Sequence, residues 1–339
     1  MSPFLKRMAP LLITIVFAAA AIAAQSETQP RISATDRIRL AEAFRLADQL
    51  GDQVWPGWNK APFAVLLVTP ETEFLMRHPK PSPDFIKLGH DALLKSDVYY
   101  RKRNFDPGFL ATFPAVPGSM ISTIVVGQAE NTWVKTSTLW VITLLHEHFH
   151  QLQDSQPNFY ADVNALGLAK GDQTGMWMLN YAFPYEKPEV QAQFALMSKL
   201  LAEAIRAAED ARVPKVRAYL EARRQFQAML AADDYKYLSF QFWKEGIARY
   251  TEIRLGRLAA TKFRASKSFR ALPDYESFAE VAQSTTERTM KQLENQKLGE
   301  SKREVAYSYG ASEAMLLDLT RPGWQRKYFV EQFDLGKYW

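Results

Sequence analysis

The chain contains no cysteine among its 339 residues. It therefore cannot form disulfide bonds, and it cannot carry a lipid anchor attached through cysteine. A fold without such cross-links depends on its hydrophobic core. Here 47% of the residues are hydrophobic and 23% are charged, which is the composition of an ordinary globular protein. Any metal site has to be built from histidine, aspartate, glutamate or tyrosine.

Long apolar runs are absent after the first 25 residues. The run Leu11–Ala24 follows Lys6 and Arg7 and ends in small residues that fit an A-x-A cleavage site. This layout predicts a secretory signal peptide over residues 1–24, because the run is shorter than the roughly 20 residues of a membrane-spanning helix. We therefore expect a periplasmic or secreted protein with no stable membrane insertion after cleavage. Retention of the segment as an uncleaved anchor is the alternative.

Excess charge of either sign is also small. Without Lys6 and Arg7, the 42 basic residues fall to 40 against 37 acidic ones, which leaves a net charge of +3. Proteins that bind nucleic acid or anionic membranes electrostatically carry a stronger positive surplus. The sequence therefore predicts no nucleic-acid partner.

Hydrophobic periodicity divides the rest of the chain into two parts. Between residues 34 and 160, a helical pattern is followed by short strand patterns. The helix covers residues 36–53, and the strands cover residues 63–68, 73–77, 97–103 and 121–127. Later helical patterns cover residues 138–153, 188–211, 213–232, 235–258, 273–284, 285–296 and 304–319. We expect an α+β fold, with a small mixed sheet in an N-terminal lobe (34–160) and a predominantly helical lobe (161–339).

Histidine is scarce, with five residues in the chain, yet three of them lie in the stretch His146-Glu147-His148-Phe149-His150. His146 and His150 are four residues apart, so on a helix both imidazoles lie on one face and can bind one zinc ion. Glu147 is placed to act as a general base toward a water molecule that the zinc activates. His148 lies about 200° around the helix from His146, and we interpret it as a packing or hydrogen-bonding residue.

A zinc site with two histidines needs a third protein ligand, with water in the fourth position. The expected helix 235–258 contains Glu245, which is followed by the small residues Gly246 and Ala248. Small residues allow two helices to approach closely, as two helices that carry ligands to one ion must. Glu245 is therefore the candidate third ligand. Taken alone, it would be interpreted as a solvent-exposed helix glutamate.

Two motifs, His146–His150 and the later stretch Trp243–Glu252, together resemble those of the gluzincin zinc metallopeptidases. The resemblance is strongest to their aminopeptidase-like (peptidase MA-like) branch. The resemblance implies that His146, His150 and Glu245 bind zinc and that Glu147 is the general base. It also implies that Glu252, seven residues after Glu245, holds a ligand histidine in place. The 94 residues between the two motifs exceed the spacing in many gluzincins, and a helical insertion would explain the difference.

Two further residues enter through the same resemblance. In this branch a Tyr-x-x-Gly pattern supplies a donor to the developing oxyanion, and Tyr307 with Gly310 has that spacing, while Tyr309 is the alternative. A core tyrosine is the other interpretation. The stretch Gly127–Asn131 is distantly similar to one whose glutamate binds the free amino terminus of a substrate, which makes Glu130 a candidate for that role. A structural or capping glutamate is the alternative for Glu130, and the preceding strand is a candidate edge strand for substrate pairing.

These features predict an exported zinc metallopeptidase that binds one zinc ion per chain and hydrolyses a peptide or protein substrate. Two alternatives stay open. One is a catalytically inactive zinc-binding scaffold of the cell envelope, although closed structural zinc sites use four protein ligands. The other is a metal-free helical interaction protein that carries the motif by chance. Both aminopeptidase and endopeptidase activity are compatible with the sequence.

Overall fold

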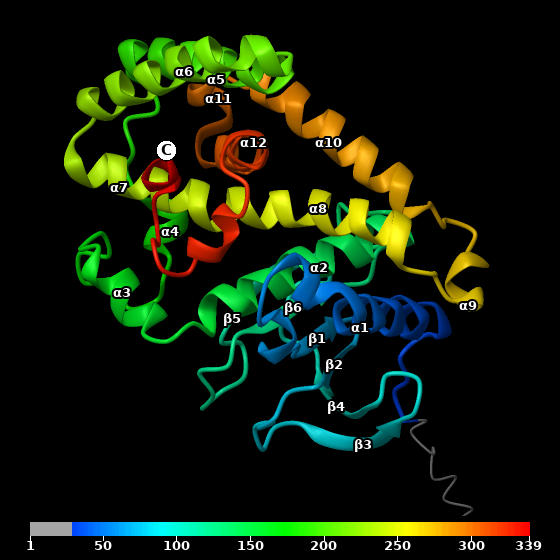
Figure 1. Ribbon diagram of the computed structural model, residues 1–339. Coiled ribbons are helices and arrows are strands. Elements are labelled where there is room, and N and C mark those ends of the chain that lie inside the picture. The colour runs from blue at the N-terminus through cyan, green and yellow to red at the C-terminus, as the bar shows by residue number, and fades with distance from the viewer. Residues whose placement is uncertain (1–28) are drawn as a thin grey trace, which may run out of the picture. The chain divides into compact units, whose positions relative to one another are not determined.

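A six-stranded mixed sheet occupies the first part of the chain, and helices form most of the rest (Figure 1). The structure, a computed structural model, describes residues 29–339, and the expected signal peptide lies outside these residues. The strand order is β3-β4-β2-β1-β6-β5. The strands are β1 (Val65–Val68), β2 (Thr72–Met76), β3 (Ile86–Asp91), β4 (Ser96–Lys102), β5 (Leu110–Phe113) and β6 (Thr123–Gly127). The α+β fold expected from the sequence is confirmed.

The central strand β1 is apolar at every position because both faces of the sheet are covered. Val65 and Leu67 of β1 belong to the main core beneath the helices, whereas Leu66 and Val68 belong to a smaller cluster on the other face, which includes Phe85. Strands β1 and β6 run parallel, and the other pairs are antiparallel. Continuous apolar runs of this kind are typical of strands buried on both faces.

The helices form layers over one face of the sheet. Helix α2 packs against β5 and β6 and lies beside α1, and α8 crosses over α2 (Figure 1). The long helices are α1 (Ala34–Val54), α2 (Ser137–Asp154), α5 (Pro188–Arg206), α6 (Glu209–Met229), α7 (Ala232–Gln241), α8 (Ile247–Lys262), α10 (Phe278–Asn295) and α12 (Val305–Thr320). Shorter helical segments are α3 (Phe159–Ala165), α4 (Trp177–Asn180), α9 (Lys267–Arg270), α11 (Leu298–Ser301) and the 3-10 turns η1 (Trp58–Lys60), η3 (Lys302–Glu304), η4 (Trp324–Lys327) and η5 (Leu335–Tyr338).

Helix α2 is buried on nearly all sides, and only Leu139 and Asp154 are partly exposed. Its first half is largely apolar, but its second half carries three histidines, a glutamate and two glutamines. A buried polar group costs free energy unless it is hydrogen-bonded. The polar half of α2 must therefore be matched by polar groups on the elements around it.

The expected helix 235–258 is interrupted near Glu245. Helix α7 leads into a π-helical turn, Phe242–Gly246 (η2), before α8 begins. A π-helical turn is rare and is often found at a functional site. The helical spacing of apolar residues continues across it, which is why the sequence predicts a single helix.

The break expected between helices 273–284 and 285–296 is wrong, because α10 is continuous. A capping box of Ser277 and Glu280 begins the helix. Within it, the hydroxyl of Thr286 donates to the Ala282 carbonyl oxygen at 2.7 Å, which is how a threonine is accommodated inside a helix.

The expected edge strand is also wrong. Strand β6, predicted as residues 121–127, lies between β1 and β5 inside the sheet, and the edge strand on this side is β5. Neither β5 nor β3 is expected from the sequence. Strand β5 has four residues and lies between Gly108 and Pro114, so turn-forming residues obscure its strand pattern.

Apolar side chains from both sides of the expected boundary after residue 160 share one continuous core. Trp140 and Phe149 belong to it together with Trp243 and Tyr328, and residues 31–339 form one unit. The division into two lobes stays a prediction. Within residues 29–339, no helix has the length and apolarity needed to cross a bilayer.

Candidate metal centre

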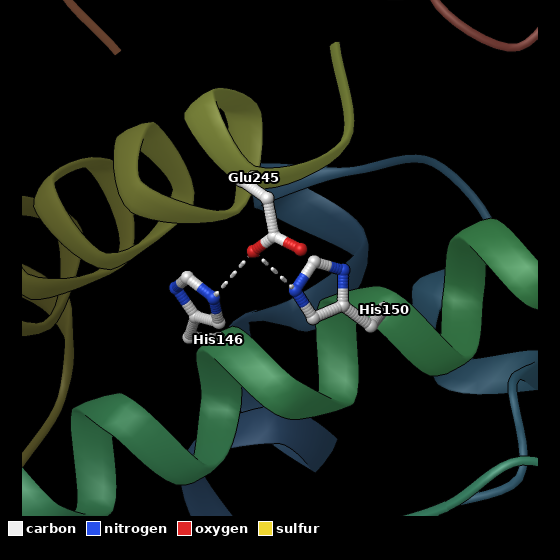
Figure 2. Close-up of side chains that lie close together, drawn as sticks. All are labelled: His146, His150 and Glu245. Carbon is white, nitrogen blue, oxygen red and sulfur yellow. Dashed lines mark ion pairs between the residues drawn. The ribbon is translucent and has the colours of Figure 1, made fainter. Parts of the chain in front are cut away.

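The histidine motif on α2 faces the π-helical turn η2. Figure 2 shows His146 and His150 projecting from α2 toward Glu245. The Oε2 atom of Glu245 lies 3.4 Å from Nε2 of His150 and 3.9 Å from Nε2 of His146. One ligand atom from each of the three residues lies within 4.8 Å of the other two. The structure thus brings together the three residues that the sequence predicts as ligands.

These donor atoms fit a zinc ion. In a tetrahedral site with bonds of about 2.0–2.1 Å, the ligand atoms are separated by about 3.4 Å, close to the two distances from Glu245 Oε2. Two imidazole nitrogens and a carboxylate oxygen are donors that zinc prefers. His146, His150 and Glu245 would hold the ion. Among residues 29–339 this is the one group of three or more metal-binding side chains, and it offers three protein ligands.

A hydrogen-bond acceptor contacts the Nδ1 atom of each candidate ligand histidine. Nδ1 of His146 lies 2.7 Å from Oε1 of Glu252, and Nδ1 of His150 lies 2.7 Å from Oε1 of Gln153. A carboxylate oxygen can only accept, so Nδ1 of His146 donates and its Nε2 faces the cluster. Glu252 thus occupies the position that the resemblance implies. Gln153 is missed by the sequence analysis, although its spacing of three residues from His150 on one helix is a usable signal.

The electrostatics of the cluster favour a positive charge at its centre. Burial lowers the pKa of His146, but the carboxylates of Glu245 and Glu252 outweigh burial and raise it to about 9. Burial raises the pKa of Glu245, but the facing His150 and His146 rings and the Arg303 guanidinium hold it well below its usual range. The ligand carboxylate therefore stays ionised, as a cation site requires.

Glu147 is held between α2 and the edge strand β5. The hydroxyl of Thr112 on β5 donates to Oε2 of Glu147 at 2.7 Å and also lies 3.1 Å from the Glu147 carbonyl oxygen. The Glu147 carboxylate therefore has a defined position on the helix that carries the candidate ligands His146 and His150. Thr112 is missed by the sequence analysis because no local pattern marks β5 or its neighbour on α2.

Tyr307, rather than Tyr309, lies beside the cluster. The Tyr307 and His146 rings have centroids 6.0 Å apart and are inclined by 24°. Tyr309 is buried elsewhere, with its hydroxyl 2.9 Å from that of Tyr219. Burial and the nearby Glu245 carboxylate raise the pKa of Tyr307 well above its usual value. Its hydroxyl therefore keeps its proton at neutral pH and can donate a hydrogen bond.

Two glycines allow α12 to approach η2. A Cβ atom on Gly246 would lie 2.4 Å from Cα of Gly310, and one on Gly310 would lie 2.5 Å from the Phe242 carbonyl oxygen. The sequence analysis expects Gly246 to let the two ligand-bearing helices approach each other, and this expectation is wrong for Gly246. Its close neighbour is α12, which carries Tyr307, so Gly246 lies against Gly310.

Glu130 lies apart from these groups. Its Oε1 atom accepts a hydrogen bond from Arg39 at 2.8 Å, and its side chain is 60% exposed. Arg39 also donates to Ser137 at the start of α2, nine residues before His146 and therefore about 13 Å away along the helix. The arrangement is that of an ion pair at the start of α2. The described contacts of Glu130 include none to the three candidate ligands.

Elements distant in the sequence thus supply a candidate metal-binding set, an adjacent carboxylate and a tyrosine hydroxyl. Such a set can bind a divalent ion and place an acid–base group and a hydrogen-bond donor next to it. Comparisons with protein-family models, curated proteins and solved structures find no match for this chain. The interpretation of the site therefore depends on the residues described above.

Proposed function

We propose that the protein is an exported zinc-dependent peptidase. The observation that carries this proposal is the convergence of His146, His150 and Glu245, whose ligand atoms lie within 4.8 Å of one another, beside Glu147. Three protein ligands leave a coordination position free, which is typical of catalytic rather than structural zinc sites. A purely structural site would also give the Glu147 carboxylate no chemical role.

The chain's own residues would divide the chemistry of hydrolysis. When bound, zinc supplies Lewis-acid chemistry, polarising a carbonyl group and acidifying water. The Glu147 carboxylate takes a proton from the attacking water and passes it to the amide nitrogen as the C–N bond breaks. The Tyr307 hydroxyl donates a hydrogen bond to the carbonyl oxygen as negative charge develops on it. One water molecule is consumed for each peptide bond broken.

An extended peptide segment is the substrate that the position of β5 supports. One side of β5 pairs with β6, and within residues 29–339 no strand pairs with its other side. Thr112 on this strand donates to Glu147, so a peptide added to the free side would run close to the proposed base. Recognition of a free amino terminus by Glu130 has less support, because Arg39 already binds that carboxylate.

Export of the protein is supported by its N-terminal composition. Lys6 and Arg7 precede an apolar run that ends in Ala-Ile-Ala-Ala, the layout of a cleavable signal peptide. A periplasmic or extracellular location also suits a chain without cysteine, whose stability does not depend on the redox state of its surroundings.

The test compares three proteins: wild type, Glu245→Ala and Glu147→Gln. We expect about one zinc ion per wild-type chain by elemental analysis, and loss or strong weakening of binding in Glu245→Ala. Glu147→Gln should keep its zinc. It should lose peptide hydrolysis by about 100-fold or more, measured with a library of quenched fluorescent peptides, because a general base contributes on this scale.

Three outcomes would count against the proposal in different ways. A wild-type protein that binds no zinc at micromolar concentrations would remove the metal site. A Glu147→Gln variant that binds zinc and hydrolyses peptides like wild type would remove the assignment of Glu147. Zinc binding without hydrolysis of any peptide would favour the inactive scaffold.

A further inference from the structure

We propose that Tyr328, in the C-terminal segment, fixes the orientation and tautomer of His150 and thereby controls the affinity for the metal. The inference rests on the proposed zinc site and adds a positioning residue to it. Tyr328 is fully buried and lies outside all the motifs discussed above. It acts through Gln153, which lies between Tyr328 and His150.

The hydrogen bonds of Tyr328 determine which way the Gln153 amide faces. The Tyr328 hydroxyl oxygen lies 2.6 Å from the carbonyl oxygen of Trp243, which can only accept, so the single hydroxyl hydrogen is used there. The same hydroxyl lies 2.7 Å from Nε2 of Gln153 and must accept from it. The amide nitrogen of Gln153 therefore faces Tyr328, and the amide oxygen faces the other way.

The amide oxygen of Gln153 in turn determines which nitrogen of His150 carries the proton. Oε1 of Gln153 lies 2.7 Å from Nδ1 of His150, and because an amide oxygen only accepts, Nδ1 must donate. A neutral imidazole protonated on Nδ1 keeps its lone pair on Nε2. This is the nitrogen that lies 3.4 Å from Oε2 of Glu245. The hydroxyl of Tyr328, as the nearest of three acceptors of Gln153 Nε2, thus favours the tautomer of His150 that can bind a metal through Nε2.

The same contacts tie the two ligand-bearing elements together. Nε2 of Gln153 also donates to the carbonyl oxygen of Lys244 at 3.2 Å. The rings of Tyr328 and Trp243 stack with centroids 4.7 Å apart and planes inclined by 11°. Residues 243 and 244 directly precede Glu245 on the π-helical turn, so its backbone is held against the helix that carries His150.

A second glutamine–histidine pair on α2 shows what is particular about this arrangement. Oε1 of Gln151 lies 2.8 Å from Nδ1 of His148, with the same three-residue spacing. Nε2 of Gln151 donates to the main-chain carbonyl oxygens of Ala64 and Ser122. Main-chain acceptors alone therefore orient Gln151. The shortest hydrogen bond of Gln153 Nε2, at 2.7 Å, instead goes to the Tyr328 hydroxyl, whereas the main-chain oxygens of Lys244 and Trp243 lie 3.2 and 3.4 Å away.

The experiment measures the zinc dissociation constant of wild type, Tyr328→Phe and Tyr338→Phe by competition with a chromophoric chelator. Tyr338 is the matched control, because it is a buried tyrosine of the same segment whose hydroxyl donates to the Glu331 carbonyl oxygen at 2.7 Å. Tyr328→Phe keeps the stacked ring and removes only the hydroxyl. We expect its dissociation constant to rise by about 10–100-fold, with that of Tyr338→Phe unchanged.

The outcomes separate this inference from the proposed function. If wild type and Tyr328→Phe bind zinc equally well, Tyr328 has no positioning role and the zinc site stands. If both tyrosine variants lose affinity in proportion to a fall in melting temperature, the effect is one of general stability, and the inference fails. If wild type binds no zinc, the proposed function fails and this inference with it.

A measurement on wild type keeps the inference testable even if Tyr328→Phe does not fold. The five histidines of the chain allow selective ¹⁵N labelling, and nitrogen chemical shifts distinguish the two tautomers. In the zinc-loaded protein we expect His150 to carry its proton on Nδ1 and to bind the metal through Nε2. Metal binding through Nδ1 would overturn the inference.

Discussion

The three histidines of α2 show how the surroundings of a residue decide its role. His146 and His150 both present Nε2 to Glu245. His148 lies on another face, where its ring stacks on that of Phe63 with centroids 3.8 Å apart and planes inclined by 4°. Burial lowers the pKa of His148 to about 3, so it is a neutral packing residue at physiological pH. One residue type thus has two roles within five positions.

The hydrogen bond from Thr112 to Glu147 leads to a prediction at the scale of the residue. Thr112→Val keeps the shape of the side chain and removes the hydroxyl, so the proposed base loses the group that orients it. We expect kcat for a cleaved peptide to fall about tenfold, a part of what a general base contributes. Zinc content should be unchanged.

Thr112→Ser is the control for this prediction because it retains the hydroxyl. It should keep most of the activity. If Thr112→Val and Thr112→Ser are equally active, the hydrogen bond to Glu147 has no role in turnover.

At the scale of the element, the π-helical turn η2 is what directs Glu245 toward α2. Such a turn contains one more residue per hydrogen-bonded turn than an α-helix, so it shifts the faces of α8 relative to those of α7. Tyr237 of α7 and Ile253 of α8 both remain in the core. Glu245, between them, points at the histidines (Figure 2).

The crossing of α12 and η2 leads to a prediction at this scale. A methyl group on Gly310 would lie 2.5 Å from the Phe242 carbonyl oxygen and 2.8 Å from Cα of Gly246, so the two backbones must move apart. We expect Gly310→Ala to lower the free energy of unfolding by about 1–3 kcal/mol, as overpacking does. Denaturant titration would measure this change.

Gly299→Ala is the matched control for Gly310→Ala. A methyl group on Gly299 would meet only the ends of the Gln191 and Glu186 side chains, which can move. We expect a much smaller effect on stability. Equal effects of the two substitutions would mean that the contact between α12 and η2 is not as tight as the distances indicate.

At the scale of the whole molecule, the site is an assembly of distant segments around α2. The sheet lies on one side of this helix and α8 on the other (Figure 1). The C-terminal segment packs against α2, where the rings of Tyr328 and Phe149 have centroids 5.9 Å apart. A metal bound at the centre would link α2, which carries His146 and His150, to η2, which carries Glu245, and it would stabilise the folded state.

Removal of the metal tests this link. A ligand that binds only the folded state, at a free concentration 100 times its dissociation constant, adds about 2.7 kcal/mol to the free energy of unfolding. We expect a chelator to lower the melting temperature of wild type by several degrees. Glu245→Ala should show little response to the chelator. A wild-type melting temperature that is the same with and without chelator would contradict the prediction.

Features that depend on residues close in the sequence could be predicted from it. The spacing of His146 and His150 places them on one helix face because the geometry of the helix is fixed. Helix α1 and strands β1, β2, β4 and β6 follow from apolar spacing in the same way, with ends shifted by one or two residues. The position of Glu245 opposite the histidines could be anticipated from the need for a third ligand and from the resemblance to a family, because Glu245 taken alone has the pattern of a solvent-exposed helix glutamate.

By itself, the sequence determined the α+β composition and the helical pair of histidines, because both follow from local backbone geometry and hydrophobic spacing. The tertiary structure alone decided that Thr112 contacts Glu147, that Gln153 connects His150 to Tyr328, and that α12 rather than another helix meets Gly246. These contacts join residues far apart in the chain. Their partners are selected by packing and by the need to satisfy buried polar groups, and no local pattern in the sequence records that choice.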